Sequence, residues 1–249
     1  ASGINQTVIA APSYFSFSSS DIEVARVNES GIVSLVGSGS AKITASIAGV
    51  SVAGSLTLNV AGGFPVAPAP TLAASNVISI FSDAYTDVAV NYYNGFWQPY
   101  QTTLGGEITI DGQNVLNYTN FNFVGTQLTA PLDISEMTHF SIDILMPEVL
   151  ATDIDMLIVL KNENATETTL QQQRIGGQTY QWSTQTGDIN DTESNATFEG
   201  GVWKTIKIPI RPTAETGLDK TGVNLIIIER IKSSNVTELH IDNLYFYKE

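Results

Sequence analysis

Short stretches in which apolar and polar residues alternate run along much of this chain of 249 residues. The clearest examples are residues 41–47 (AKITASI) and 54–60 (GSLTLNV), which Gly-containing turns separate. Alternation with period two is typical of a strand that buries one face, whereas helical periodicity is weak throughout. Strands this short bury their apolar faces by pairing two sheets, so the sequence predicts an all-β protein built from sandwiches.

A spacer rich in Gly, Pro and Ala, residues 61–72 (AGGFPVAPAPTL), divides this pattern in two. Alternating proline favours extended backbone and a semi-rigid separation of the flanking units. We therefore expect a first β-sandwich over residues 1–60, a linker over 61–72 and a second, larger domain over 73–249. Further runs in the second domain indicate the strands of a two-sheet jelly roll: residues 108–110, 115–118, 140–146, 156–160, 203–210, 223–228 and 239–247.

The formal charge of −14, from 25 acidic and 11 basic residues, narrows the range of ligands. Such a field repels a phosphate backbone and argues against nucleic-acid binding, whereas a neutral polysaccharide meets no such penalty. The chain has no cysteine, which excludes disulfides, thiolate nucleophiles and Cys-based metal sites. No apolar run approaches the ~20 residues of a membrane helix. Any secretory leader or lipid anchor is expected to precede Ala1, so membrane contact would come only through an upstream anchor.

Two tryptophans lie in polar, loop-like surroundings that are typical of saccharide sites: Trp97 in NGFWQPYQ and Trp182 in TYQWSTQTG. An indole face can stack on the C–H face of a pyranose ring, while nearby amide and hydroxyl groups bind the sugar hydroxyls. A core position is an equally good interpretation of either tryptophan. Nearness in sequence adds secondary binding candidates: Gln98, Tyr100, Arg174 and Tyr180. Trp203 opens the alternating run VWKTIKIPI, and we expect it to be structural.

An acidic residue, Asp242, stands within the otherwise apolar and aromatic run LHIDNLYFY. A lone carboxylate there is costly unless it is paired or bound to a cation. The first and last strands of a jelly roll are often neighbours, which would bring Asp83 and the turn that ends at Asp87 close to Asp242. Carboxylates with backbone carbonyls form an oxygen-only site that suits Ca²⁺ in a structural role. The alternative is that Asp242 accepts backbone amides and Asp83 caps a turn.

Signals for catalysis are weak. Glycoside hydrolysis needs two carboxylates that flank the scissile bond. Two pairs could be nominated, without loop aromatics beside either: Glu107 with Asp111, and Asp133 with Glu136. His139 and His240 lie within strand patterns, and we expect both to be framework residues. A nucleophile elbow, a zincin motif and a phosphate loop are all missing, so no enzyme is expected.

The first domain carries a resemblance to a known family. Residues 18–49, SSSDIEVARVNESGIVSLVGSGSAKITASIAG, resemble the group 2 bacterial immunoglobulin-like domain along nearly their whole length. This resemblance implies an immunoglobulin-like β-sandwich that serves as a spacer. Such domains normally have further strands before the position of Ser2, so the domain is expected to be incomplete at its start.

The second domain resembles a β-sandwich module found in polysaccharide-degrading and glycan-binding proteins of Bacteroidetes. The segments SIFSDAYTDVAVN, FWQ, EITIDGQNVLNY, ISEMTHFSIDI, VWKTIKIPI and LHIDNLYFY carry this resemblance. Members resemble calcium-stabilised carbohydrate-binding modules, which supports Asp83 and Asp242 as calcium ligands.

Taken together, the two resemblances imply a cell-surface glycan-binding protein that is exported to the outer membrane, facing outward, or secreted. We expect a monomer that works beside glycan-uptake proteins and binds a neutral β-glucan such as laminarin. A jelly-roll glycoside hydrolase or polysaccharide lyase is the first alternative, and a purely structural or adhesive repeat is the second.

Overall fold

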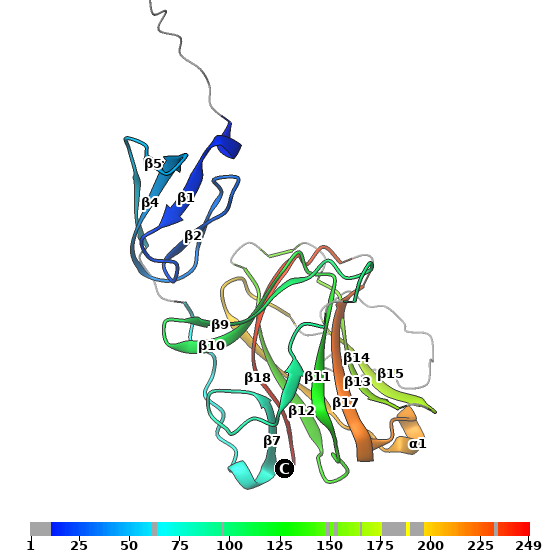
Figure 1. Ribbon diagram of the computed structural model, residues 1–249. Helices are drawn as coiled ribbons and strands as arrows, with labels where there is room; N and C mark the ends of the chain where they lie inside the picture. The colour runs from blue at the N-terminus through cyan, green and yellow to red at the C-terminus, as the bar shows by residue number, and fades with distance from the viewer. Residues whose placement is uncertain are drawn as a thin grey trace, which may run out of the picture. The chain divides into compact units, whose positions relative to one another are not determined.

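The computed structural model describes residues 11–60, 64–95, 97–147, 150–151, 154–164, 166–175, 197–231 and 234–249, and the backbone of 188–189. The chain forms two compact units. The first runs to Phe64 and also includes Thr109–Gln113, while the second takes Pro65–Ile108 and Asn114–Glu249. Strands dominate both units, which confirms the all-β class (Figure 1). None of the helices in the described parts of the chain has the length and apolar content to cross a bilayer.

The first unit is a small pair of sheets behind a 3₁₀ turn, η1 (Pro12–Tyr14). In the larger sheet, β4 (Gly39–Ile47) pairs with β1 (Ser16–Ser19), β5 (Val50–Ser51) and β6 (Leu56–Val60). The smaller sheet is the hairpin of β2 (Ala25–Val27) and β3 (Val33–Leu35), whose turn places Gly31 at a φ of 76°. Glycine adopts this left-handed conformation without the strain that a side chain would add.

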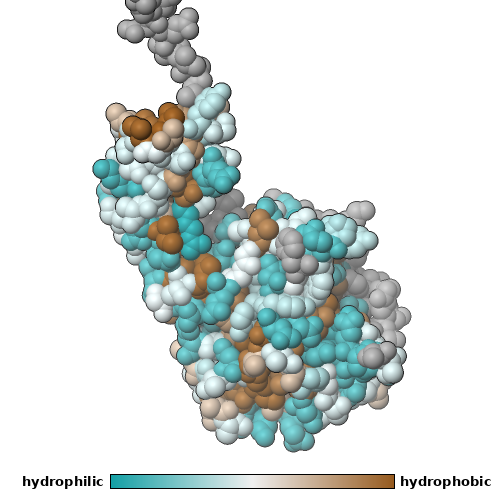
Figure 2. All heavy atoms as spheres, viewed as in Figure 1, coloured by the Kyte–Doolittle hydropathy of each residue, from teal (hydrophilic) through white to brown (hydrophobic). Residues whose placement is uncertain are grey.

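The core of the first unit is small. Its fully buried apolar residues are Val24, Ala25, Ala41 and Ile43. Several large apolar side chains remain exposed instead: Ile22, Ile32, Leu35, Val50 and Leu56. Figure 2 shows brown patches among the teal on this unit. Short strands on two small sheets bury little surface, which limits what such a unit gains from burial.

The second unit is a sandwich of two sheets with six strands each (Figure 1). The first sheet has the order β16-β12-β18-β10-β9, with β7 also paired to β18. Its strands are β7 (Val77–Phe81), β9 (Leu104–Ile110), β10 (Gln113–Thr119), β12 (His139–Leu145), β16 (Trp203–Pro209) and β18 (Glu238–Tyr247). The expected neighbourhood of first and last strands is confirmed, since β7 pairs antiparallel with β18.

The second sheet has the order β15-β14-β13-β17-β11-β8. Its strands are β8 (Val90–Tyr92), β11 (Phe123–Leu132), β13 (Met156–Glu163), β14 (Thr168–Ile175), β15 (Asp188–Ile189) and β17 (Val223–Arg230). The short elements η2 (Ala74–Asn76), α1 (Thr213–Thr216) and η4 (Lys220–Gly222) complete the described secondary structure.

Alternation decides which face of the second sheet joins the core. Met156, Ile158 and Leu160 of β13 point into the main core together with Ile226 and Ile228 of β17. The residues between them point to the opposite face of the sheet, because successive side chains of a strand alternate. This outer face carries the candidate site.

The linker behaves differently from a free spacer. From Pro65 onward it is hydrogen-bonded to the second unit: the carbonyl of Pro65 accepts from Trp203 Nε1 at 2.7 Å, and that of Leu72 accepts from the Tyr85 hydroxyl at 3.0 Å. Between them the carbonyl of Pro68 accepts from Asn243 Nδ2 at 2.9 Å. We call residues 65–72 the strap. Trp203 is therefore structural, as expected, and its indole N–H fixes the start of the strap.

Candidate functional site: a groove on the outer face of the second sheet

A groove of about 410 Å³ lies on the outer face of the second sheet. Small-molecule sites in proteins commonly fall between roughly 300 and 1,000 Å³. The lining residues come from the loop after β8 and from β11, β13 and β17: Trp97, Phe123, Gln127, Lys161, Glu163, Leu225, Ile227 and Glu229.

Strand register explains why these residues meet. Each row across β13, β17 and β11 puts one side chain from each strand on the outer face, because register partners share a face of the sheet. The rows are Leu157–Glu229–Phe123, Val159–Ile227–Gly125 and Lys161–Leu225–Gln127. Tyr92 of β8 continues the last row beside Gln127.

Trp97 provides the aromatic platform of the groove. Its indole stacks on the ring of Phe123, with centroids 5.8 Å apart and planes inclined by 19°. Its backbone is held by a tight loop, in which the Trp97 N–H donates to Gln101 Oε1 at 2.8 Å and the Gly95 N–H donates to the Gly125 carbonyl at 3.0 Å. The side chain is partly exposed. The choice between a loop position and a core position is therefore settled for Trp97 in favour of a partly exposed ring.

Gly125 makes room for that platform. A Cβ atom at this position would lie 1.9 Å from Cη2 and 2.6 Å from Cζ3 of Trp97. Carbon atoms in contact are normally about 3.5–4.0 Å apart. The edge of the indole can lie against β11 only because residue 125 has no side chain.

Polar groups surround the platform on the same face. Gln127 donates from Nε2 to the Asn224 carbonyl at 3.0 Å, which fixes the amide and turns Oε1 toward other donors. Lys161 Nζ lies 3.0 Å from Glu163 Oε2, so this cation is already paired. Glu229 is only partly exposed, and burial raises the pKa of its carboxyl.

The other predicted binding residues take different places. Tyr100 is 78% exposed and Gln98, which precedes a cis peptide bond to Pro99, is also exposed; neither lines the groove. Arg174 is 7% exposed and forms a buried ion pair with Asp155, so its charge is matched inside the protein. Trp182 and Tyr180 lie outside the described residues.

The acidic residues predicted to bind calcium lie around one buried node. Asp242 is 5% exposed, and burial raises the pKa of its carboxyl to about 7, with further contributions from Asp83, Asp143 and Asp87. Asp143 is opposite Asp242 in the pairing of β12 with β18. Asn243, at a φ of 50°, donates from Nδ2 to Asp143 Oδ2 at 2.7 Å and accepts from the Ser82 hydroxyl.

The oxygens of these carboxylates have few free positions. Both oxygens of Asp83 accept from Asn114, at 2.7 and 3.0 Å, while those of Asp87 accept from the Ser79 hydroxyl and the Ser82 N–H. Asp242 Oδ1 accepts from the Asn243 N–H at 2.6 Å. The described residues contain no group of three or more His, Cys, Asp or Glu side chains arranged to hold a metal. A cation at this node would therefore need backbone carbonyls as well as carboxylates.

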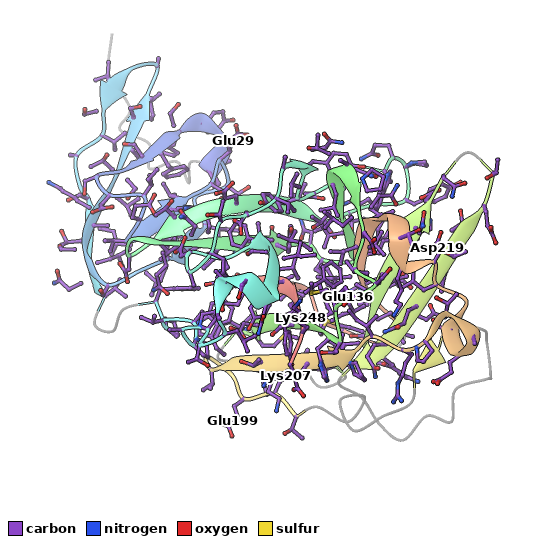
Figure 3. The ribbon with its side chains drawn as sticks, turned by 90° about the horizontal axis from the view of Figure 1, so that it is seen from below. Glu29, Glu136, Glu199, Lys207, Asp219 and Lys248 are labelled. Atoms are coloured by element: carbon purple, nitrogen blue, oxygen red, sulfur yellow. The ribbon has the colours of Figure 1, made fainter. Side chains whose placement is uncertain are left out.

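The residues considered for catalysis are not assembled. Asp133 and Glu136 are exposed, and Glu136 is labelled in Figure 3. His139 stacks on Tyr247 with ring centroids 5.0 Å apart. His240 lies 2.7 Å from Asn117 Nδ2, and burial lowers its pKa to about 4, so it is neutral near pH 7.

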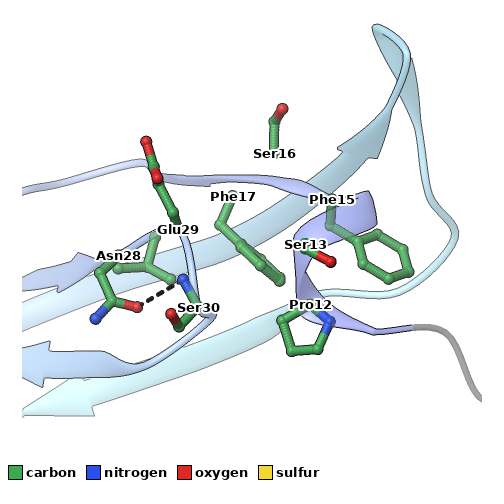
Figure 4. A pocket seen from close by; sticks show the side chains of 9 residues that line it. Pro12, Ser13, Phe15, Ser16, Phe17, Asn28, Glu29 and Ser30 are labelled. Carbon is green, nitrogen blue, oxygen red and sulfur yellow. Dashed lines mark hydrogen bonds between the residues drawn. The ribbon is translucent and has the colours of Figure 1, made fainter.

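The first unit has a larger hollow of about 730 Å³ (Figure 4). Its walls are serines, Pro12, Asn28 and Glu29, and its aromatic residues, Phe15 and Phe17, are inclined by 36° at a centroid distance of 5.9 Å. The edge of the Phe17 ring packs against Gly31, where a Cβ would lie 3.0 Å from Cζ. Phe17 therefore supports the hairpin turn.

No protein-family model matches the chain, and no curated protein matches it in sequence. Among solved structures it is similar to the family 30 carbohydrate-binding module of a cellulosomal cellulase of Clostridium thermocellum, with 17% identity over 70% of this chain and 98% of that one, and a TM-score of 0.45. It is also similar to a family 11 module of the same organism, solved with a β-1,3-1,4-mixed-linked tetrasaccharide (16% identity, 69% and 94% covered, TM-score 0.38). A third similarity is to SGBP-B from a xyloglucan utilization locus in Bacteroides uniformis (11% identity, 92% and 63% covered, TM-score 0.35). Similarity this distant leaves the ligand to be argued from the residues of this chain.

Proposed function

We propose that this protein binds polysaccharide without transforming it, and that the groove on the second sheet is the binding site. The observation that carries the proposal is the Trp97 indole, stacked on Phe123 and with the edge of its six-membered ring against Gly125 in an open groove. A flat, partly exposed aromatic face beside fixed polar groups is what a pyranose ring requires, since one face of the sugar is apolar and its edge carries hydroxyls.

The arrangement supplies both parts of such an interaction. Contact with an aromatic face contributes on the order of 1 kcal/mol, and a hydrogen bond to a charged acceptor contributes roughly 1.5–3 kcal/mol. Gln127 Oε1 and the carboxylate of Glu229 are acceptors on the same face as the platform. A few such contacts give the micromolar to millimolar affinities that suit reversible capture of a long polymer.

The spacing of the groove carboxylates argues against the hydrolase alternative. Glu229 is in register with Leu157, and Glu163 lies six residues further along β13. At roughly 3.3 Å per residue this places the Cα atoms of the two glutamates about 20 Å apart. Glycosidases need their two carboxyl groups within roughly 5–9.5 Å, so Glu163 and Glu229 cannot flank one glycosidic bond.

The ligand we propose is a neutral β-glucan such as laminarin. The net charge of −14 disfavours polyanionic chains at long range. The groove itself also disfavours a polyanionic chain, because its single lysine is already paired with Glu163.

The wider role proposed is that of an exported, outward-facing protein of a bacterial cell surface, or a secreted one. The immunoglobulin-like resemblance of residues 18–49 supports a spacer role for the first unit, with any membrane attachment upstream of Ala1. In this setting the chain acts as a monomer beside glycan-uptake proteins.

Calcium is proposed as a structural ion at the node of Asp83, Asp87 and Asp242. The support is electrostatic: Asp242 is buried among other carboxylates, and burial raises the pKa of the neighbouring Asp143 although the side chains of Thr205 and Asn243 hydrogen-bond to it. A divalent cation would balance this negative charge and tie the turn after β7 to β18.

Affinity electrophoresis in gels that contain laminarin or a mixed-linkage β-glucan tests the binding proposal. We expect the protein to be retarded, Trp97→Ala to lose most of the retardation, and Tyr100→Ala to keep it, because Tyr100 lies outside the groove. Equal retardation of both variants would contradict the assignment of the groove. Release of reducing ends from either glucan by the unchanged protein would favour the hydrolase alternative instead.

A further inference from the structure

Glu229 is the unusual residue of the groove. It extends from β17 directly beside Phe123 of β11, which in turn stacks on Trp97. Opposite neighbours on one face of an antiparallel pair have Cβ atoms about 4.5–5.5 Å apart. The carboxylate therefore lies at the edge of the aromatic platform, where the hydroxyls of a stacked sugar ring would be.

The carboxylate of Glu229 has no hydrogen bond or ion pair with any residue that the structure describes. The cations of the neighbouring strands are matched elsewhere, since Lys161 pairs with Glu163 and Arg174 pairs with Asp155. Partial burial without compensation raises the pKa of Glu229. A half-buried carboxylate without a partner loses hydration and gains nothing in return, unless a ligand supplies donors.

We infer that Glu229 accepts hydrogen bonds from the hydroxyls of a saccharide stacked on Trp97, and that it makes the groove reject saccharides that carry carboxylates. This inference rests on the proposed function. A sugar hydroxyl donates a charge-assisted hydrogen bond to the glutamate. A uronic acid in the same place would instead put a second negative charge beside it, in surroundings that screen charge poorly.

The rejection is local, so it differs from the repulsion by the net charge of the whole protein. Long-range repulsion is screened within about 8 Å at physiological salt. A contact between two carboxylates inside the groove is screened much less. Neutralising one exposed acid elsewhere therefore makes the net charge less negative by the same amount without relieving the rejection.

The experiment uses two probes that differ only in charge: laminarin, and laminarin whose primary hydroxyls have been oxidised to carboxylates. Binding of both to the full chain is measured by isothermal titration calorimetry at 0.15 M salt. The variant is Glu229→Gln, which keeps the shape and an acceptor but removes the charge. The matched control is Glu136→Gln, which removes the same charge from an exposed turn outside the groove (Figure 3).

We expect the unchanged protein and Glu136→Gln to bind laminarin and to bind the oxidised probe at least about tenfold more weakly. Glu229→Gln should bind laminarin several-fold more weakly than the unchanged protein does. Its affinities for laminarin and for the oxidised probe should be nearly equal. If laminarin binds and Glu229→Gln shows the same ratio between the probes as Glu136→Gln, the inference is wrong while the proposed function stands. If neither laminarin nor any other neutral glycan binds to the unchanged protein, the proposed function fails and this inference fails with it.

Discussion

Replacing Gly125 with alanine tests whether the position of Trp97, stacked on Phe123 and against Gly125, is what binds the ligand. The new Cβ would lie 1.9 Å from Cη2 of the indole, which is about 2 Å closer than normal carbon contact. The indole is the free end of a side chain at the surface, so it should move rather than β11. Its movement breaks the stack on Phe123, which is worth about 0.5–1.5 kcal/mol.

Binding and folding should respond differently to this substitution. Alanine in a strand is more favourable than glycine by roughly 0.5–1 kcal/mol, which offsets the lost stack, so the unfolding midpoint in urea should change little. Affinity for a neutral glucan should fall by about tenfold, equivalent to ~1.4 kcal/mol, because the ligand loses its platform. Near-ultraviolet circular dichroism should also change in the absence of ligand, since it reports the packing of the indole.

Gly106→Ala is the matched control for this test. Gly106 lies in β9 of the other sheet, and a Cβ there would meet nothing within 4 Å. Unchanged affinity of Gly125→Ala for a glucan that the parent protein binds would refute the reasoning, since it would mean that the position of the indole is irrelevant to capture.

Three further predictions concern stability. Asp242→Asn should remove a pH dependence of stability. In the parent protein the folded state keeps a proton on Asp242 up to about pH 7, while the unfolded chain releases it near pH 4, so in chelator its free energy of unfolding should fall by up to about 4 kcal/mol as the pH rises across that window. Urea titrations of the variant should lack this fall. Added calcium should raise the melting temperature of the parent protein and suppress the same fall with pH, whereas a melting temperature indifferent to calcium and chelator would count against the ion. Trp203→Phe should cost about 1 kcal/mol in urea unfolding, because the Pro65 carbonyl loses its donor; an unchanged midpoint would show that the strap is held by other contacts.

The sequence predicted the strands whose apolar residues either alternate or form a short continuous run. Residues 140–146, 203–210 and 239–247 correspond to β12, β16 and β18, and residues 156–160 fall within β13. The period of two is visible in β12 and β16 without knowledge of the partner strand, whereas residues 156–160 stand out as an uninterrupted apolar run.

The strands that the sequence did not reveal have polar residues on the inside. In β14, Gln171 and Gln173 are buried and pair with backbone groups: Gln171 donates to the Pro209 carbonyl and accepts from the Arg211 N–H, while Gln173 donates from Nε2 to the Arg174 carbonyl. A buried glutamine that pairs with backbone hides the apolar alternation. Arg174 could be taken for a loop residue near an aromatic segment for this reason, although it lies in β14 and pairs with Asp155.

The sequence revealed only part of the candidate site, for a related reason. Trp97 stood out because its neighbours are polar, but the groove residues Phe123 and Gln127 come from β11, which no pattern indicated. Gly125, Thr126 and Gln127 break its run of apolar residues, and the same Gly125 is what admits the indole. Phe123 and Glu229 are 106 positions apart in the sequence and meet only through strand register, so local spacing could not find them.

The strap changes where this protein can be divided. Side chains of the second unit already occupy the carbonyls of Pro65, Pro68 and Leu72. A chain cut at residue 73 would remove one acceptor from each of three donor groups, among them the buried amide of Asn243, which would keep its bond to Asp143. Anyone who transplants the second unit into another scaffold should therefore carry these eight residues along with it. The proline-rich segment from Pro65 onward is better regarded as the first piece of the second unit than as a linker outside it.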